Sequence, residues 1–341
     1  MSNKQILAED LKFFVEHFPF LEEVKGKTFM VSGATGLIGS VFIKCLLQLN
    51  ETLHTDIKII AIARNKAKAE SIFGAADIQW IFRDLLELTS IADYKVNYIV
   101  HCASATSSRF FIEQPVETLL TAFQGTDLLL RYARDNKVDS MVYLSSLESY
   151  GTVLEEREIS EDDCGYIKST DVRSCYSLGK RSVECLCHSY SKEYGVPVKI
   201  ARLTQVFGAG VSPDDNRVFA QFAKSILRKE NITLHTTGES SKPYCYTIDA
   251  VLALLHLLIK GESGEAYNVA NADSYISIHG MAEMLAATFS HDTKVIIDLR
   301  DDMGYAPSTK LKLNTSKLEA LGWQAHFSLE EMFERLLAYF S

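Results

Sequence analysis

Three glycines at a spacing of three, Gly33, Gly36 and Gly39, follow an apolar segment and precede a helical pattern. The first glycine suits a tight turn, the second lets a pyrophosphate approach the backbone, and the third allows close packing of helix on strand. The following helix directs its N-terminal amides at the phosphates. The segment predicts a dinucleotide site; the alternative is a plain strand–turn–helix corner. The residues expected at the dinucleotide are Gly33, Thr35, Gly36, Leu37, Ile38 and Gly39.

Apolar segments alternate with helical patterns through roughly the first two hundred residues. The near-continuous apolar run at 57–64 is typical of a strand that is buried on both faces of a parallel sheet. We expect further strands at 27–32, 78–82, 96–103, 140–146 and 198–203. The pattern predicts an α/β fold, a Rossmann doubly wound parallel sheet with a crevice at the carboxyl ends of its strands.

The pattern is less regular beyond Gly208, which predicts a smaller C-terminal substrate-binding lobe. We expect an N-terminal helical extension at 1–25 and an NAD(P)-binding Rossmann domain with the catalytic residues at 26–208. Residues 209–341 should form mainly the substrate-binding lobe, interleaved with the Rossmann domain. The polar, acidic stretch at 155–171 is expected to be a loop over the crevice.

Composition excludes several classes of protein. The net charge of −9 argues against broad binding to nucleic acid or to anionic membranes. The longest apolar run, 251–259, is too short to span a bilayer. Nine histidines without a His-x-x-x-His pair predict no metal site. Seven irregularly spaced cysteines fit a reducing compartment, and the early acidic residues do not resemble a secretory signal, so a cytoplasmic protein is expected.

Tyr176 and Lys180 are four residues apart in a predicted helix, which places a phenol and an ammonium on one face. The spacing predicts that the ammonium lowers the pKa of the Tyr176 phenol, so that the phenol serves as a general acid or base. An isolated pair of this kind is more often a solvated surface pair. This pair, however, follows the glycine motif and a strand that ends in Ser145 and Ser146, whose hydroxyls should emerge at the same sheet edge.

With these motifs the chain resembles the extended short-chain dehydrogenases/reductases, in particular the NAD(P)-dependent epimerase/dehydratase family of nucleotide-sugar enzymes. The resemblance covers nearly the whole chain. It rests on the glycine motif, Asp84, segments 101–104 and 145–151, the Tyr176/Lys180 pair and the ending at 318–323. Segments 172–181 and 195–202 are most similar to the UDP-glucuronate decarboxylase group.

The resemblance implies roles for individual residues. Ser146 matches a hydroxyl that binds the sugar beside the catalytic Tyr176, and Lys180 matches a lysine that also holds the nicotinamide ribose. Glu148 matches a carboxylate that acts near C5 and C6 of the sugar; the alternative is a solvated loop carboxylate. Asp84 matches an adenine-contacting position; the alternative is a helix N-cap. The further cofactor-binding residues expected are Arg64, Asp84, Leu85, Ala103 and Ser104, and the substrate-binding residues expected are Ser146, Glu148, Gln205, Arg217 and Lys242.

Four positions depart from the family pattern. Leu147 replaces the acidic residue of 4,6-dehydratases, which disfavours 4,6-dehydration. Lys242 replaces an arginine usual in decarboxylases and loses its bidentate fork, while Gln205 replaces an asparagine and adds a methylene. The second strand ends in Arg64 and Lys66 instead of an acidic residue, which favours NADP over NAD. The alternative is that Arg64 stacks on adenine and serves either dinucleotide.

Three functions remain open from the sequence. The first is a nucleotide-sugar enzyme that transfers a hydride at a carbinol or carbonyl carbon, in the manner of UDP-glucuronate decarboxylases or epimerases. The second is an NADPH-dependent reductase of a nucleotide-linked keto sugar, and the third is a catalytically silent, cofactor-binding regulatory protein. Ser146, Tyr176 and Lys180 favour an enzyme. The resemblance also implies a homodimer, with the helix after Pro115 and the Tyr176 helix paired across a two-fold axis.

Overall fold

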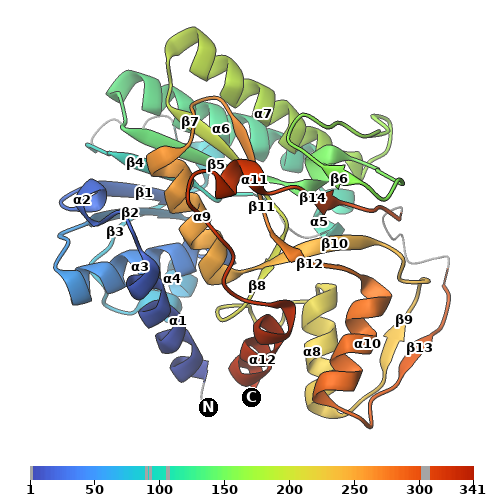
Figure 1. The fold of residues 1–341 in the computed structure, drawn as a ribbon. Coiled ribbons are helices and arrows are strands. Elements are labelled where there is room, and N and C mark those ends of the chain that lie inside the picture. Colours follow the sequence, from blue (N-terminus) through green and yellow to red (C-terminus); the bar gives the residue numbers. More distant parts are fainter. Residues whose placement is uncertain (1–2, 89–90, 92–93, 105–107, 301–307) are drawn as a thin grey trace.

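The computed structural model describes residues 3–88, 91, 94–104, 108–300 and 308–341 (Figure 1). Its centre is a seven-stranded sheet in the order β11-β7-β5-β4-β1-β2-β3, in which every neighbouring pair is parallel. The predicted doubly wound parallel sheet is therefore confirmed. The strands are β1 (Thr28–Ser32), β2 (Lys58–Ala63), β3 (Gln79–Phe82), β4 (Tyr98–His101), β5 (Ser140–Ser146), β7 (Val198–Leu203) and β11 (Ala266–Val269).

Helices cover both faces of this sheet, because its central strands are apolar on both sides. One face packs against α3 (Leu37–Leu53) and α9 (Thr247–Lys260), and their side chains share one core cluster with the sheet. The other face packs against α6 (Pro115–Asn136) and α7 (Ser174–Tyr194), which lie side by side above the sheet in Figure 1. The shorter α4 (Lys66–Phe73) and α5 (Ser108–Glu113) and the 3-10 turns η1 (Leu85–Glu87) and η2 (Leu147–Tyr150) follow β2, β4, β3 and β5.

A smaller lobe lies below and to the right of the sheet in Figure 1. It contains the three-stranded sheet β12-β10-β8, formed by β8 (Gln205–Phe207), β10 (Ser241–Tyr246) and β12 (Asn271–Ser277). The pair β13-β9 joins Val295–Ile297 to Ile232–Leu234, and α8 (Val218–Arg228) and α10 (Ile278–Phe289) complete the lobe. Strand β11 lies beyond residue 208 and yet belongs to the central sheet, so the two parts interleave; the boundary at 208 stays a prediction.

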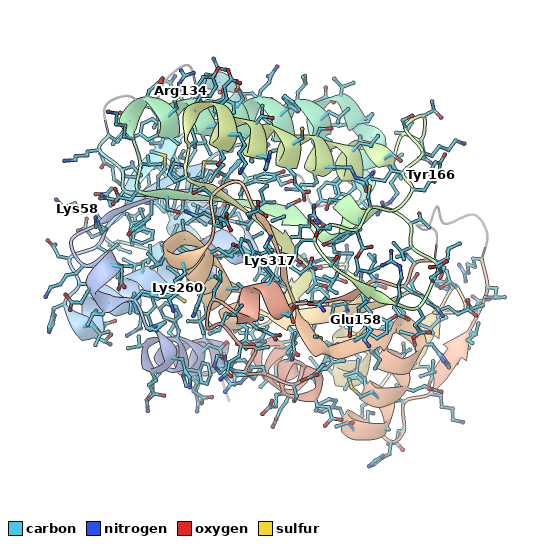
Figure 2. All side chains as sticks on the ribbon, turned by 45° about the horizontal axis from the view of Figure 1, so that its top comes forward. Lys58, Arg134, Glu158, Tyr166, Lys260 and Lys317 are labelled. Carbon is cyan, nitrogen blue, oxygen red and sulfur yellow. The ribbon has the colours of Figure 1, made fainter. Side chains whose placement is uncertain are left out.

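The stretch at 155–171 is more ordered than the loop that its polar composition predicts. Its strand β6 (Glu158–Ile159) pairs with β14 (Lys312–Leu313), which precedes α11 (Ser316–Glu319). The backbone pairing is short and joins two segments that are far apart in the sequence, so local composition carries no signal for it. The stretch is also bound to the turn after β5, since the Gly165 amide donates to the Tyr150 carbonyl at 2.8 Å and Tyr166 forms a β-bridge with Thr152. The Tyr166 side chain, 70% exposed, lies at the periphery in Figure 2.

The N-terminal helix α1 (Asn3–His17) packs against α3 and the C-terminal helix α12 (Leu329–Phe340), and the short α2 (Leu21–Val24) leads into β1. Asp10 of α1 is fully buried and accepts hydrogen bonds from Tyr246 Oη at 2.6 Å and Arg335 Nη1 at 2.7 Å. Burial raises the pKa of the Asp10 carboxyl to about 6. Within the described residues, no helix has both the length and the apolar character needed to cross a membrane.

Candidate active site

The glycine turn between β1 and α3 has the shape that a dinucleotide requires. Gly33 has a φ of +68°, and a Cβ there would lie 2.7 Å from the backbone nitrogen of Ala103. A Cβ on Gly39 would lie 2.5 Å from the carbonyl oxygen of Gly33, so helix and turn are in close contact. Gly36 is the N-cap of α3, and α3 lacks a side-chain cap. The amides of its first turn, which include those of Leu37 and Ile38, therefore suit a pyrophosphate.

The other expected cofactor residues follow neighbouring strands at the same sheet edge. Arg64 follows β2 and Asp84 follows β3, and Arg64 Nη1 lies 3.4 Å from Asp84 Oδ2. Asp84 also accepts a hydrogen bond from the Leu86 amide at 3.0 Å, so it does cap η1, which begins at the buried Leu85. Ala103 and Ser104 follow β4. The fold thus collects these residues around the glycine turn.

Ser146, Tyr176 and Lys180 converge where β5 ends and α7 begins. A hydrogen bond links the side chains of Ser146 and Tyr176, and the Tyr176 ring stacks on Phe111 with centroids 4.3 Å apart. Lys180 Nζ donates to the Leu144 carbonyl at 2.7 Å and lies 5.7 Å from the centroid of the Tyr176 ring. The predicted helical face is therefore confirmed as a geometric arrangement.

The predicted lowering of the Tyr176 pKa is not found in this structure. The pKa of the Tyr176 phenol is raised, first by burial and then by the negative charge of Glu148. The hydrogen bond from Ser146 and the positive charges of Arg173 and Arg217 act in the opposite direction. The Lys180 ammonium donates to the Leu144 carbonyl, and burial lowers its own pKa to about 8.

Glu148 lies on η2, directly after the strand that ends in Ser146. Its carboxylate accepts a hydrogen bond from Arg173 Nη1 at 3.0 Å and a longer one from Ser177 Oγ at 3.4 Å. Its backbone amide donates to Ser146 Oγ at 3.2 Å. Glu148 is therefore a partnered carboxylate and not the solvated loop carboxylate that the sequence left as an alternative. Arg173 was missed as a site residue; its position three residues before Tyr176, within the family-like segment, was the available signal.

The three expected substrate-binding residues of the smaller lobe differ in how fully they are partnered. Gln205 Oε1 on β8 is buried without a hydrogen-bond partner in the described part of the chain. Arg217 forms a bidentate pair with Asp215, at 2.6 Å between Nη2 and Oδ2. Lys242 on β10 has no hydrogen-bond or ion-pair partner that the described residues supply. Burial lowers the pKa of its ammonium, Glu148 opposes this, and Arg217 and Arg173 add to the lowering.

Glu148, Arg173 and Arg217 influence the pKa of Tyr176 and also that of Lys242, so these three charged side chains lie near both groups. Because Arg173 and Arg217 each have a carboxylate partner, the unbalanced positive charge belongs to Lys242. A group of side chains with this charge attracts anions. An orphaned amide oxygen and an unpartnered ammonium are groups that a polar, anionic ligand satisfies.

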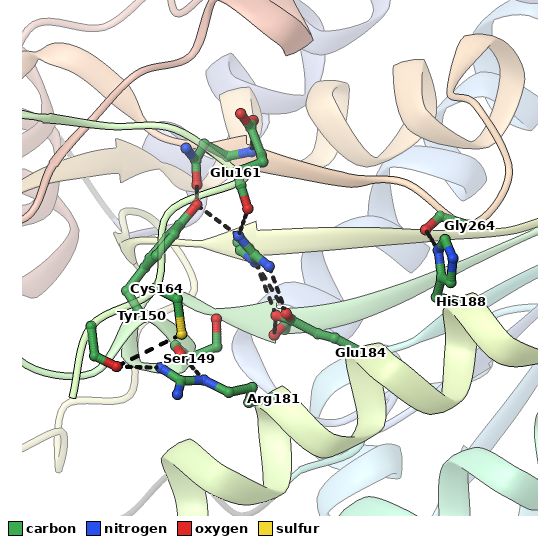
Figure 3. Close-up of polar contacts among 12 residues, drawn as sticks. Ser149, Tyr150, Glu161, Cys164, Arg181, Glu184, His188 and Gly264 are labelled. Carbon is green, nitrogen blue, oxygen red and sulfur yellow. Dashed lines mark hydrogen bonds and ion pairs between the residues drawn. The ribbon is translucent and has the colours of Figure 1, made fainter. Parts of the chain in front are cut away.

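A buried polar network connects η2 to α7 and β7 (Figure 3). Glu184 on α7 accepts from Ser145 Oγ and, at 3.1 and 2.9 Å, from Nε and Nη2 of Arg202. Arg202 Nη1 also donates to Tyr150 Oη at 2.9 Å and to the Glu161 carbonyl at 2.6 Å. Arg181 donates to the Ser149 carbonyl at 2.8 Å. The turn that carries Glu148 is therefore fixed to α7 and β7 at several points.

Comparisons with known proteins agree with this geometry. The model of the NAD dependent epimerase/dehydratase family matches residues 29–270. UDP-glucuronic acid decarboxylase 1 of Danio rerio is 28% identical over 339 residues, which are 96% of this chain and 77% of the fish protein. UDP-glucuronic acid decarboxylase 6 of Arabidopsis thaliana is 28% identical over 305 residues, which are 89% of this chain and 85% of the plant protein.

Solved structures show the same fold at lower sequence identity. The UDP-glucuronic acid 4-epimerase of Bacillus cereus, in complex with UDP-glucuronic acid and NAD, has a TM-score of 0.76 at 22% identity, with 92% of this chain and 98% of that chain covered. The dTDP-glucose 4,6-dehydratase of Bacillus anthracis, in complex with NAD, has a TM-score of 0.74 at 21% identity, with 92% and 96% covered. The resemblance inferred from the motifs is confirmed, and the chain belongs to the NAD-dependent epimerase/dehydratase family.

Proposed function

We propose that the protein oxidises a nucleotide-linked hexuronate at C4 and decarboxylates it. The observation that carries this proposal is the partnered Glu148 beside Tyr176, with Leu147, which cannot donate a proton, at the preceding position. The similarity to UDP-glucuronic acid decarboxylases over most of the chain supports a uronate as substrate.

The proposed residue roles follow from the arrangement. NAD(P), when bound along the glycine turn, supplies reversible hydride exchange at C4. Tyr176 takes the proton of the C4 hydroxyl as C4 becomes a ketone, and Ser146 holds the C4 oxygen. The raised pKa of the phenol makes this proton transfer dependent on groups that favour the phenolate, namely the Ser146 hydrogen bond and the nearby arginines. Lys180 binds the nicotinamide ribose as well as the Leu144 carbonyl.

Decarboxylation then uses the ketone as an electron sink. The C5–C6 bond breaks, its electron pair moves into the C4 carbonyl, and C6 leaves as CO₂. C5 takes one proton from solvent, relayed by Glu148, and Tyr176 returns its proton when C4 is reduced. The net reaction converts a uronate and one proton into a pentose and CO₂, without net oxidation. Gln205, Arg217 and Lys242 bind the nucleotide diphosphate and the sugar.

The test is an incubation of the purified protein with UDP-glucuronate, with CO₂ release and the UDP-sugar product measured. Glu148→Gln should remove most of the CO₂ release while the protein still binds cofactor. An unchanged rate of CO₂ release in this variant would contradict the role of Glu148. Oxidation of NADPH by a nucleotide-linked 4-keto sugar, without CO₂ release from a uronate, would instead establish the reductase.

The reductase is the second candidate because of the cations at the end of β2. Arg64 is 78% exposed in its side chain and Lys66 is 69% exposed, at the place where NAD-preferring Rossmann proteins carry a carboxylate. We therefore propose a preference for NADP over NAD. This preference suits a reductase, which consumes NADPH as its reductant. Arg64→Asp should reverse the preference, as measured by calorimetry with both dinucleotides on stripped protein. Tighter binding of NAD by the wild type would contradict the proposal.

We also propose a homodimer. Four exposed apolar side chains follow one stripe of α6, the helix that packs along α7. They are Val116, Leu119, Leu120 and Phe123. Burial of this stripe against a second copy removes apolar surface from water. Light scattering that finds a monomer at micromolar concentration would contradict the homodimer.

All seven cysteines are free, which supports a reducing, cytoplasmic setting for the enzyme.

A further inference from the structure

Arg173 is placed where a cation is unfavourable unless an anion is near. It is the N-cap residue of the 21-residue helix α7. The N-terminus of a helix carries partial positive charge, so the helix dipole opposes a guanidinium there. The first turn of α7 has no acidic residue that compensates. Two carboxylates outside the helix compensate: Asp171 accepts from the Arg173 backbone amide at 2.9 Å, and Glu148 on η2 pairs with the guanidinium itself at 3.0 Å.

The arginines around the active site differ in how many of their guanidinium nitrogens already donate hydrogen bonds. Arg202 uses Nε, Nη1 and Nη2, and Arg217 uses Nε and Nη2 for Asp215. With respect to the described residues, Arg173 uses only Nη1, for Glu148. Its remaining N–H groups are available for a second, bidentate acceptor.

The position of Arg173 relative to Tyr176 identifies the group that such an acceptor belongs to. Arg173 precedes Tyr176 by three residues on α7, and its charge acts on the phenol. In a nucleotide-linked hexuronate, the carboxylate is attached to C5, next to the C4 hydroxyl, whereas the diphosphate is attached to C1 across the ring. A cation one helical turn from the phenol is therefore nearer to the carboxylate than to the diphosphate.

We propose that Arg173 recognises the carboxylate of the hexuronate, and that Glu148 occupies Arg173 until the substrate carboxylate replaces it. This inference rests on the proposed function. The pair can exchange because its side chains are 25% and 34% exposed, so solvent screens their attraction. The side chains of the Arg202–Glu184 pair are only 14% and 8% exposed, so this pair does not exchange partners in this way. A neutral hexose leaves Glu148 bound to Arg173, whereas a uronate releases it for work at C5.

The test measures dissociation constants for UDP-glucuronate, UDP-glucose and UDP by calorimetry on the cofactor-loaded protein. Arg173→Met should weaken binding of UDP-glucuronate about 10- to 100-fold and change binding of the two other ligands by less than about 3-fold. Glu148→Gln should tighten binding of UDP-glucuronate alone, because the competing carboxylate is removed. Arg217→Met is the matched control, and it should weaken all three ligands to a similar degree.

Equal losses for all three ligands in Arg173→Met, or weaker binding of UDP-glucuronate by Glu148→Gln, would overturn the inference. A selective loss of UDP-glucuronate in Arg217→Met instead would assign the carboxylate to Arg217 and overturn it as well, as would a wild type that does not prefer UDP-glucuronate to UDP-glucose. Failure of the proposed function has a different signature. In that case the wild-type protein binds UDP-glucuronate through Arg173 and releases no CO₂.

Discussion

Glu184→Gln tests whether the buried network behind η2 stabilises the fold. The Glu184 side chain is 8% exposed and that of Arg202 is 14% exposed, so the substitution leaves a guanidinium without its counter-charge inside the protein. Breaking a buried ion pair in this way costs about 3–5 kcal/mol. We expect the lower end, because Arg202 keeps Tyr150 and the Glu161 carbonyl as acceptors.

The loss converts into a measurable shift of the melting temperature. An unfolding entropy of about 2.1 cal/mol/K per residue gives about 0.7 kcal/mol/K for a chain of this length, so about 3 kcal/mol lowers Tm by about 4 °C. The assay is calorimetric melting of Glu184→Gln, Arg202→Met and the double variant Glu184→Met/Arg202→Met. The double variant should melt above either single variant, because it leaves no unpaired charge. Additive losses, or a shift below about 1 °C for Glu184→Gln, would refute the reasoning.

The same variant has a signature in the pH profile. Burial lowers the pKa of the Lys180 ammonium to about 8, and the charge of Glu184 opposes this lowering. Without that charge, Lys180 deprotonates at lower pH. The alkaline limb of the activity profile should therefore move to lower pH in Glu184→Gln. An unmoved limb would contradict the effect of the Glu184 charge on the pKa of Lys180.

Three further predictions address the phenol, the turn and the N-terminal helix. Tyr176→Phe should lower turnover by about 10²–10⁴-fold with cofactor binding retained, because the ring keeps its stacking on Phe111; near-normal turnover would exclude the phenol as acid and base. Gly39→Ala should weaken dinucleotide binding in calorimetry, because the added Cβ would lie 2.5 Å from the Gly33 carbonyl oxygen; unchanged affinity would mean that the turn relaxes freely. For Asp10, a folded-state pKa of about 6 against 3.8 means that the folded protein holds the proton more tightly. The unfolding free energy of the wild type should therefore rise relative to Asp10→Asn by most of about 3 kcal/mol from about pH 7 to about pH 4. Denaturant titrations that give parallel curves for both proteins would contradict this.

The long apolar elements were predictable from sequence because local pattern and burial agree in them. The strands at 140–146 and 198–203 begin and end where the sequence predicts them. The lobe strands β8, β10 and β12 were not identified. They are short or contain polar residues, and β8 and β10 pair across a long separation in the sequence. Partners of that kind are set by tertiary contacts.

The candidate site divides in the same way. Spacing predicted that Tyr176 and Lys180 share a face, because helical geometry is local. Spacing could not predict which acceptor the Lys180 ammonium binds, since the Leu144 carbonyl comes from a different element. The pairing of Glu148 with Arg173 likewise depends on how η2 meets the start of α7. A sequence motif therefore names the reacting groups, whereas their charge states follow from neighbours that only the fold supplies.

The adjacency of β7 and β11 has a consequence for synthesis on the ribosome. The two strands are neighbours in the central sheet, yet residues 204–265 lie between them and build much of the smaller lobe. A nascent chain that has emerged only as far as β7 presents that strand as an open edge, with unpaired amides and carbonyls ready to pair with another chain. The edge closes only after the intervening segment has left the exit tunnel. Completion of the nucleotide-binding sheet is thus tied to emergence of the lobe, and residues 26–208 produced alone would keep the aggregation-prone edge that the whole chain covers.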